Sequence, residues 1–453
     1  MRTPPWRIQS AVAGAAWPAV PAAGGAAVLS VLYQLERTQW LATQELLGLQ
    51  LSQLEVLLRH AQATVPWYRA RWAAAYDPVA PLTYERFSRL PLLTRRDLTQ
   101  GYRDLQSHQT PQAHGAPEER RTSGSTGAPV RFLATPLTGL YWNAFTLRDH
   151  DWHGRDLSCK LAVIRRETEA SDVANWGPAT AGLVATGRSV GNSIREDAQM
   201  QLDWLVRERP AYLFTYPSLL GELARLSLLR GVRLEGLQEV RTLAESLAPG
   251  LRELCREAWG APLTDLYSAS EAGYLALQCP QHEHYHVQAE GVLLEVLDDT
   301  GAPCVPGQVG RVVVTPLHNF AMPLVRYDIG DYAEAGEPCA CGRGLPVLKR
   351  ILGRVRNMLT TADGKRYWPV FGTRALMDSA PVLQVQFVQK SHDLVEARIV
   401  AAAPLSGAQE AQFRDRVLSM LPPGMSLRFA YCDSIARSAS GKFEEFVSEV
   451  SAA

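Results

Sequence analysis

Short apolar runs alternate with amphipathic segments through the middle of the chain, between residues 160 and 267. The apolar runs cover residues 160–164, 212–216, 240–244 and 263–267, and the amphipathic segments cover residues 200–208, 219–229 and 251–259. Strands and helices that alternate in this way form strand–helix–strand units. The pattern therefore predicts an α/β fold in which a mainly parallel sheet is covered by helices.

The pattern changes after residue 291. Apolar runs at 292–297, 311–316 and 324–327 are separated by turn residues at 298–301 and 306–307, which is typical of antiparallel hairpins. Farther along, strands are expected at 382–388, 394–400 and 426–431 and a helix at 409–421, which together make a small α+β unit. We therefore expect an N-terminal domain of residues 1–353, with a β subdomain at about 279–353, and a C-terminal domain of residues 354–453.

The N-terminal part predicts a helix and no membrane span. Leucines at 47, 51, 54 and 58 recur at helical spacing, which indicates a helix over residues 35–65. No charge occurs from residue 8 to residue 35, but this run is rich in Ala and Gly and is broken by Pro18 and Pro21. A membrane helix needs roughly 20 strongly apolar residues. We therefore expect a cytoplasmic protein.

Charge and cysteine content exclude several classes of partner. The 46 basic residues balance the 46 acidic ones, so no overall field favours nucleic acid, and an anionic substrate must be held by a local site. Hydrophobic residues make up 46% of the chain, which is typical of a globular protein. Seven cysteines are too few for a disulfide scaffold and leave at least one thiol unpaired, which fits a reducing compartment.

A loop rich in Gly and hydroxyl groups runs from Thr122 to Val130, with the sequence Thr-Ser-Gly-Ser-Thr-Gly-Ala-Pro-Val. It leads into an expected strand at 130–134. Glycines allow the backbone to approach a polyphosphate, and hydroxyl and N–H groups are donors to its oxygens. The loop lacks the Gly-Lys-Ser/Thr ending of a Walker loop, so a P-loop ATPase is disfavoured. The alternative is an ordinary surface loop.

Four further motifs follow this loop. They are Tyr267-Ser-Ala-Ser-Glu271, Arg326-Tyr-Asp-Ile-Gly-Asp331, Gly353-Arg-Val-Arg-Asn-Met358 and Ser438-Ala-Ser-Gly-Lys-Phe443. In this order and at these separations, the five motifs resemble the adenylate-forming superfamily of acyl-CoA synthetases. The chain is most similar to the phenylacetate-CoA ligase branch, which includes the capsule-biosynthesis adenylating proteins. The resemblance covers about residues 40–450.

The resemblance implies a site for ATP and Mg²⁺. The ATP-binding residues that it implies are Ser123, Gly124, Ser125, Thr126, Gly127, Tyr267, Ser270 and Asp331. Within this set, the loop residues cover the phosphates, Tyr267 is a platform for adenine and Asp331 accepts both ribose hydroxyls. Glu271 helps to hold Mg²⁺, a hard cation that prefers carboxylate oxygen. The alternatives are that Tyr267 is a packing residue and that Asp331 caps the turn at Gly330.

The resemblance also implies a mobile C-terminal lid. Lys442 matches the lid lysine, whose ammonium neutralises charge that develops during adenylation. Arg354 matches the catalytic arginine that opens the hinge, and Arg356 stands at the hinge pivot, where the family often has Asp or Lys. The Tyr267-Ser268 pair, Arg356-Asn357 and Glu444 depart from the family pattern.

Cysteines and histidines cluster around the expected hairpins. Cys279 precedes histidines at 282, 284 and 286, and Cys339-Ala-Cys341 follows. Three thiolates and one imidazole would complete a closed, structural Zn²⁺ site. Relatives with a similar arrangement favour His286, so the predicted ligands are Cys279, His286, Cys339 and Cys341. The alternative is free thiols and surface histidines, since C-x-C is less common than C-x-x-C.

The expected reaction is the ATP-dependent activation of an aryl or acyl carboxylic acid, followed by transfer to a thiol, for which coenzyme A is the leading acceptor. Adenylyl transfer to a substrate hydroxyl and acyl transfer to a carrier protein are the alternatives. A silent binding protein is disfavoured because Glu271 and Lys442 are both present. We expect the acid pocket to draw on residues 216–218, Glu245 and residues 269–274, and a homodimer is compatible with the sequence.

Overall fold

The computed structural model describes residues 6–72, 75–122, 129–165, 168–354, 357–367, 369, 371, 376, 380–435 and 443–450. The chain forms two compact units. The first unit comprises Met1–Cys159, Val173–Ser189 and Asp265–Ile351, and the second comprises Lys160–Asp172, Val190–Thr264 and Leu352–Ala453. These units are interleaved in sequence, and the continuous domains 1–353 and 354–453 remain a prediction.

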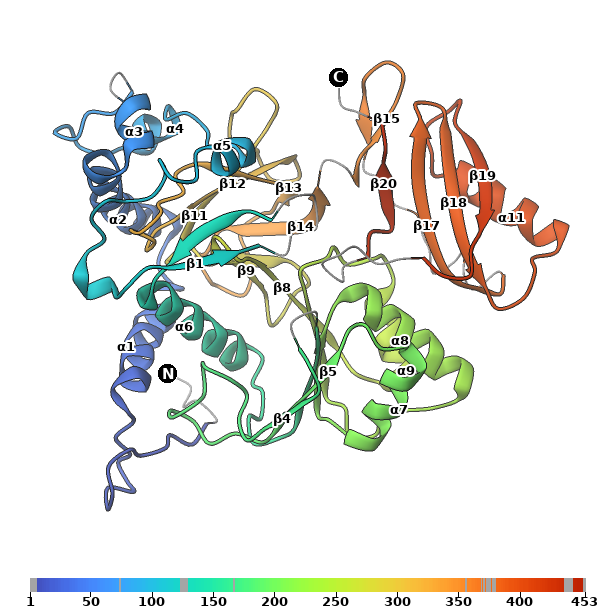
Figure 1. The fold of residues 1–453 in the computed structure, drawn as a ribbon, viewed down its shortest axis with the longest axis horizontal. Coiled ribbons are helices and arrows are strands. Elements are labelled where there is room, and N and C mark those ends of the chain that lie inside the picture. The colour runs from blue at the N-terminus through green and yellow to red at the C-terminus, as the bar shows by residue number, and fades with distance from the viewer. Residues whose placement is uncertain are drawn as a thin grey trace. The chain divides into compact units, whose positions relative to one another are not determined.

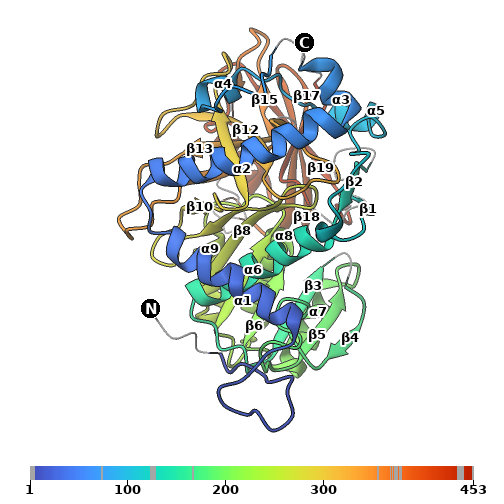
Figure 2. The same ribbon diagram turned by 90° about the vertical axis from the view of Figure 1, so that its left-hand side faces the viewer.

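The helices of the first unit lie mostly before residue 153. They are α1 (Ala23–Thr38), α2 (Thr43–Thr64), α3 (Pro66–Arg71), α4 (Tyr84–Ser88), α5 (Arg95–Gln100), η1 (Gln112–His114) and α6 (Pro136–Trp152). Helices α1 and α6 pack side by side, and α2 lies against the strands β12 and β13 (Figure 2). No helix among the described residues combines the length and apolar character needed to cross a membrane.

The predicted helix over 35–65 is wrong at its start, because α1 ends at Thr38 and α2 begins at Thr43. A loop that is distant in sequence contacts the chain at the break between α1 and α2. The backbone N–H of Gly344 donates to Gln39 O at 2.9 Å, and Leu41 O lies where a Cβ on residue 344 would stand. Only glycine allows this close approach, so a tertiary contact determines where the helix breaks.

Antiparallel pairing dominates the strands that belong mainly to the first unit. They are β8 (Leu263–Ala269), β9 (Gly273–Gln278), β10 (Tyr285–Val287), β11 (Val292–Leu297), β12 (Val309–Pro316), β13 (Tyr327–Ala335) and β14 (Val347–Arg354), in the order β11-β12-β13-β14-β10-β9-β8. The predicted hairpins are confirmed by the antiparallel pairs β11–β12 and β12–β13. Strand β1 (Glu118–Arg121) pairs separately with β2 (Arg131–Ala134), the strand expected at 130–134.

The predicted strand at 324–327 is wrong, because β13 begins only at Tyr327. The preceding residue, Arg326, has a left-handed φ of 48°, which a strand does not accommodate. Its buried guanidinium forms an ion pair with Glu295, with Nε and Oε2 3.0 Å apart. The apolar pattern did not reveal the turn at Arg326, where this buried ion pair lies.

The strands between 161 and 243 lie mainly in the second unit and form the predicted parallel sheet. They are β3 (Leu161–Arg165), β4 (Ser171–Val173), β5 (Ser189–Ser193), β6 (Tyr212–Thr215) and β7 (Glu239–Leu243), in the order β7-β6-β3-β5-β4. The pairs β3–β6 and β6–β7 are parallel. Helices α7 (Ala198–Glu208), α8 (Pro217–Arg230) and α9 (Leu251–Trp259) share a buried apolar core with these strands. The α/β prediction is confirmed.

The small α+β unit at the C-terminus is also confirmed. Its sheet has the order β19-β18-β17-β20, formed by β17 (Val382–Ser391), β18 (Leu394–Ala401), β19 (Ser426–Tyr431) and β20 (Phe446–Ser448). Helix α11 (Gly407–Leu418) packs against β19, as Figure 1 shows, and begins at a capping box formed by Ser406 and Gln409. The short strands β15 (Leu359–Thr360) and β16 (Arg366–Tyr367) precede this sheet.

Candidate active site

Tyr267 and Asp331, which the motifs assign to one nucleotide, lie in direct contact. The Tyr267 hydroxyl donates a hydrogen bond of 2.7 Å to Asp331 Oδ2, although 64 residues separate the two in sequence. Tyr267 stands near the end of β8 and is 8% exposed, and Asp331 lies within β13. The bond fixes the orientation of the Asp331 carboxylate before any ligand arrives.

The turn at Gly330 is capped by Asp328. The Gly330 N–H donates to Asp328 Oδ1 at 3.0 Å, and Gly330 adopts a φ of 82°. Burial raises the pKa of Asp328. The Gly330 N–H thus has Asp328 as its partner, and the role of Asp331 stays a prediction.

Ser270 and Glu271 lie in the turn that joins β8 to β9. The pair Ala269–Gly273 closes this turn, and Gly273 has the positive φ of 87° that favours glycine. Glu271 is only 7% exposed. A carboxylate this deeply buried is stable as an anion only beside cations or hydrogen-bond donors. Glu271 thus lies in the turn that directly follows β8, the strand that carries Tyr267.

Several predicted site residues lie outside the described part of the chain. These are Ser123, Gly124, Ser125, Thr126 and Gly127 of the phosphate loop, the hinge residue Arg356 and the lid residue Lys442. Arg354 is described and ends β14. Its backbone N–H donates to Asn357 Oδ1 at 3.2 Å, and Asn357 Nδ2 donates to Phe446 O at 2.7 Å. Sequence reasoning noted Asn357 only as a departure from the family and missed this bridge.

Residues 216–218 and Glu245 of the predicted acid pocket meet in the second unit. Ser218 and Glu245 line one cavity of about 100 Å³, together with Phe443. Glu245 accepts hydrogen bonds from the backbone N–H groups of both Ser218 and Phe443. Residues 269–274, the remaining part of the predicted pocket, belong to the first unit. No sequence signal indicated the contact between Glu245 and Phe443.

The cysteines and histidines of the predicted metal site come together in the first unit. Cys279 Sγ lies 3.9 Å from Cys339 Sγ, and Cys341 Sγ lies 3.4 Å from His286 Nε2. Tetrahedral Zn²⁺ with ordinary bond lengths sets two sulfur ligands about 3.8 Å apart and a sulfur and a nitrogen about 3.6 Å apart. The observed spacings therefore fit a zinc ion.

A second histidine joins the cluster. Donor atoms of Cys279, His284, His286 and Cys339 all lie within 4.8 Å of one another. His284 Nε2 and His286 Nδ1 are buried and have no hydrogen-bond partner among the described residues. Cys341 Sγ lies next to His286 but is not part of this group. Among the described residues, His284 and His286 each have a donor atom in the group, and which of them would bind a metal stays a prediction.

The electrostatics of the cluster keep its imidazoles neutral but do not favour thiolate at every cysteine, because burial raises the pKa of Cys279 and raises that of Cys339 to about 12. Burial lowers the pKa of His286 to about 3 and also lowers the pKa of His284, so both imidazoles are neutral near pH 7. Burial acts to raise the pKa of Cys341, but hydrogen bonds from the backbone and side chain of Arg343 together outweigh it and lower the pKa. Neutral imidazole and thiolate are the forms that bind zinc.

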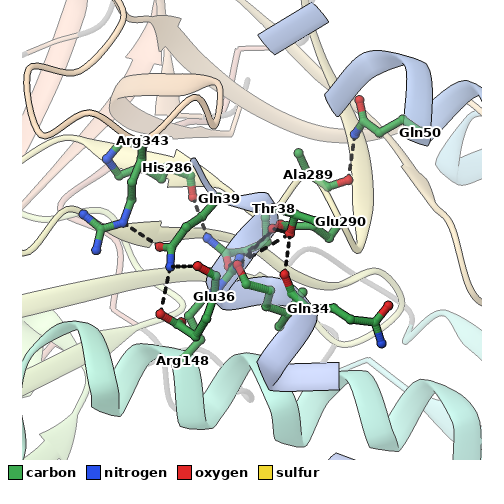
Figure 3. Close-up of polar contacts among 12 residues, drawn as sticks. Gln34, Glu36, Thr38, Gln39, Gln50, Arg148, His286, Ala289, Glu290 and Arg343 are labelled. Atoms are coloured by element: carbon green, nitrogen blue, oxygen red, sulfur yellow. Dashed lines mark hydrogen bonds and ion pairs between the residues drawn. The ribbon is translucent and has the colours of Figure 1, made fainter. Parts of the chain in front are cut away.

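Arg343 ties the cluster to the end of α1 (Figure 3). Its Nη1 lies 3.6 Å from Cys341 Sγ, and its Nε donates to Gln39 Oε1 at 2.8 Å. Its guanidinium also stacks over the Trp152 ring at 4.3 Å. Arg343 therefore contacts both Cys341, a candidate metal ligand, and Gln39, which lies at the break between α1 and α2.

Comparison with known proteins gives one relative in sequence. No family model matches the chain. It is 29% identical over 352 residues to the phenylacetate-coenzyme A ligase of Thermus thermophilus, and the match spans 73% of this chain and 74% of the relative.

Solved structures share the fold. A 2-hydroxyisobutyryl-CoA ligase in the postadenylation state has a TM-score of 0.72 at 20% identity, with 91% of this chain and 92% of that one covered. An anthranilate CoA ligase in complex with anthranoyl-AMP has a TM-score of 0.54 at 18% identity, with 72% and 64% covered. The chain is therefore similar in sequence to a phenylacetate-CoA ligase and shares its fold with two further CoA ligases.

Proposed function

We propose that this protein is an AMP-forming acid–thiol ligase. A carboxylic acid reacts with Mg·ATP to give an acyl-adenylate and pyrophosphate, and the thiol of coenzyme A then attacks the acyl carbon and displaces AMP. Adenylation is needed because a free carboxylate would have to expel oxide, whereas AMP is a good leaving group. The protein contributes positioning and charge stabilisation.

The contact between Tyr267 and Asp331 carries this proposal. Two residues assigned to one nucleotide by separate motifs share a hydrogen bond of 2.7 Å. A carboxylate held in a fixed orientation suits a ribose diol, which offers two hydroxyl donors. Tyr267 lines the adenine, and Glu271, buried in the adjacent turn, supplies an oxygen to Mg²⁺.

The remaining parts of the proposed site rest on sequence motifs. Ser123, Gly124, Ser125, Thr126 and Gly127 cover the phosphates, and Ser270 completes the nucleotide site. Lys442 neutralises charge on the α-phosphate and carboxylate during adenylation. Arg354 and Arg356 act at the hinge about which the lid reorients between the two half-reactions.

The cysteine–histidine cluster binds a structural Zn²⁺ in this proposal. Cys279, Cys339 and Cys341 supply three thiolates, and His286 or His284 supplies the fourth ligand. Four protein ligands close the coordination shell, so the metal would stabilise the fold and take no part in the reaction. The donor spacings support this role, as does the buried His284 Nε2, which has no hydrogen-bond partner among the described residues.

Coenzyme A is the proposed acceptor because the Thermus relative is a phenylacetate-coenzyme A ligase. Aryl and acyl acids are the proposed substrates. None of the seven cysteines, all of which lie in the described residues, forms a disulfide, which fits the cytoplasm. A homodimer remains a prediction that light scattering would test.

Pyrophosphate release measured with a panel of aryl and fatty acids, with and without coenzyme A, tests this function. Acid-dependent pyrophosphate together with a thioester product is the expected result. AMP retained on a product hydroxyl would instead identify an adenylyltransferase. A thioester formed only with a carrier protein would replace coenzyme A as the acceptor.

A further inference from the structure

Glu245 joins two backbone segments that are far apart in sequence. Ser218 N–H donates to Glu245 Oε2 at 3.0 Å, and Phe443 N–H donates to Glu245 Oε1 at 2.8 Å. These donors lie 27 and 198 residues from Glu245 along the chain. All three residues belong to the second unit.

The carboxylate is held where ligands bind in α/β sheets. Ser218 lies in the first turn of α8, directly after β6, and Glu245 follows β7. Both positions are therefore at the carboxyl ends of parallel strands, the edge at which such sheets bind ligands. The helix N-terminus also stabilises the negative charge of Glu245. The carboxylate is thus preorganised to receive the Phe443 N–H.

The chain after Phe443 is attached to the small C-terminal sheet. Gln386 Nε2 donates to Glu444 O at 2.9 Å, and Phe387 N–H donates to Glu445 O at 2.8 Å. Strand β20 then continues in parallel with β17. Phe443 therefore links two parts of the second unit. Its own N–H bonds to Glu245, and the two residues after it bond to β17 of the C-terminal sheet.

The same loop lies close to the chain where it enters the C-terminal region. Ser246 Oγ stands 2.8 Å from the position of a Cβ on Gly353. Asn357 connects the two ends, because it accepts from Arg354 N–H and donates to Phe446 O. Residues 245 and 246 therefore contact the chain on both sides of the C-terminal sheet.

We propose that Glu245 is a positioning residue that holds the lid in place for adenylation and releases it for thioester formation. The inference rests on the proposed function, because Phe443 directly follows the lid lysine Lys442. A hydrogen bond to the Phe443 backbone fixes the chain next to that lysine at the ligand-binding edge. The bond must break when the lid reorients. Glu245 and Phe443 both line a cavity of about 100 Å³, so the packing around their hydrogen bond is incomplete.

Hydrogen exchange of the Phe443 amide in Glu245→Gln tests the bond directly. The amide side chain keeps one acceptor oxygen for two donors, so we expect the Phe443 N–H to exchange at least about tenfold faster than in the wild type. Glu253→Gln is the matched control, because it neutralises an exposed carboxylate on α9 whose partner is Arg256. Unchanged exchange in Glu245→Gln would overturn the proposal.

The two half-reactions, with phenylacetate as the probe acid, test the positioning role. We expect Glu245→Gln to lower pyrophosphate release by about tenfold to a hundredfold and to lower thioester formation from supplied phenylacetyl-adenylate by a clearly smaller factor. Equal losses in both steps would show a merely structural role. If the wild type does not use phenylacetate, the proposed function loses support for that acid, and the exchange measurement still decides the role of the bond.

Glu245→Gln could also weaken the hydrogen bond from Ser218 in the first turn of α8. Phe443→Pro therefore tests the contact by removing the donor instead of the acceptor. Proline removes the N–H and leaves the bond between Ser218 and Glu245 in place. Phe443→Leu, which keeps the N–H, is its control. Selective loss of adenylation in the proline variant alone supports the proposal, whereas equal behaviour of the two variants would overturn it.

Discussion

Arg343 donates a hydrogen bond of 2.8 Å to Gln39, and this bond ties the cysteine–histidine cluster to the junction of the two N-terminal helices. Gln39 is fully buried at the break between α1 and α2. Gly344, the next residue after Arg343, donates its N–H to Gln39 O. The loop that carries Cys339 and Cys341 therefore supports the packing of α1 and α2.

We expect purified protein to contain about one equivalent of zinc, and Cys339→Ser and Cys341→Ser to lose both the metal and thermal stability. Because of the link through Arg343, metal removal by a chelator should expose the chain at residues 39–42 to proteolysis. Elemental analysis and limited digestion measure the two effects. Cys432→Ser, a cysteine outside the cluster, serves as the control. A fully folded wild type without metal would contradict the zinc site.

Asp331→Ala should lower kcat/KM for ATP by at least about a hundredfold, because two hydrogen bonds to a charged acceptor are lost. Tyr267→Phe removes only the hydrogen bond that orients Asp331 and should cost about tenfold. The matched control is Asp328→Asn, which weakens the cap of the Gly330 turn and should lower stability by roughly 1 kcal/mol without a comparable kinetic loss. Kinetics and thermal midpoints are measured on the same preparations. Near-normal kinetics in Asp331→Ala would exclude its role as a ribose ligand.

Lys442→Ala should abolish formation of the acyl-adenylate and leave thioester formation from a supplied acyl-adenylate largely intact. The reason is that the lid lysine acts in only one of the two lid positions. The two half-reactions are measured separately by pyrophosphate release and by thioester formation. Equal loss of both would count against a lid that alternates between two positions.

The buried pair Arg148–Glu290, drawn in Figure 3, should make stability depend on acid pH. Burial acts to raise the pKa of Glu290, but Arg148 and Thr38 together hold it below its ordinary value of 4.5. A lowered folded-state pKa gives stability that is present above pH 4.5 and is lost as the pH falls through the folded-state pKa. Glu290→Gln should cost about 3 kcal/mol at neutral pH.

Thermal midpoints of the wild type and Glu290→Gln from pH 7 to pH 3 check this prediction. The difference between the two proteins should shrink as the pH falls below about 4.5. Glu253→Gln, which lies in an exposed ion pair, should follow the wild type at every pH. A constant difference across the range would show that protonation of Glu290 does not control this part of the stability.

Local patterns in the amino-acid sequence were enough to predict the kinds of elements and the set of candidate site residues. Alternating apolar runs between residues 160 and 267 predicted the parallel sheet correctly. The reason is that the burial of residues within each strand and helix produces a local apolar pattern in the sequence. The hairpins β11–β12 and β12–β13 followed from turn residues between apolar runs. Motif order indicated the family, and cysteine and histidine spacing indicated a metal site.

Features that depend on residues distant in sequence became visible only in the folded chain. Gly344 places the break between α1 and α2, and Glu295 pairs with the left-handed Arg326 just before β13. Packing likewise brought His284 into the cysteine–histidine cluster and the Phe443 backbone to Glu245. A local pattern indicates which side chains are buried. It does not indicate which distant backbone group or charge a side chain contacts, because these contacts form only when the whole chain has packed.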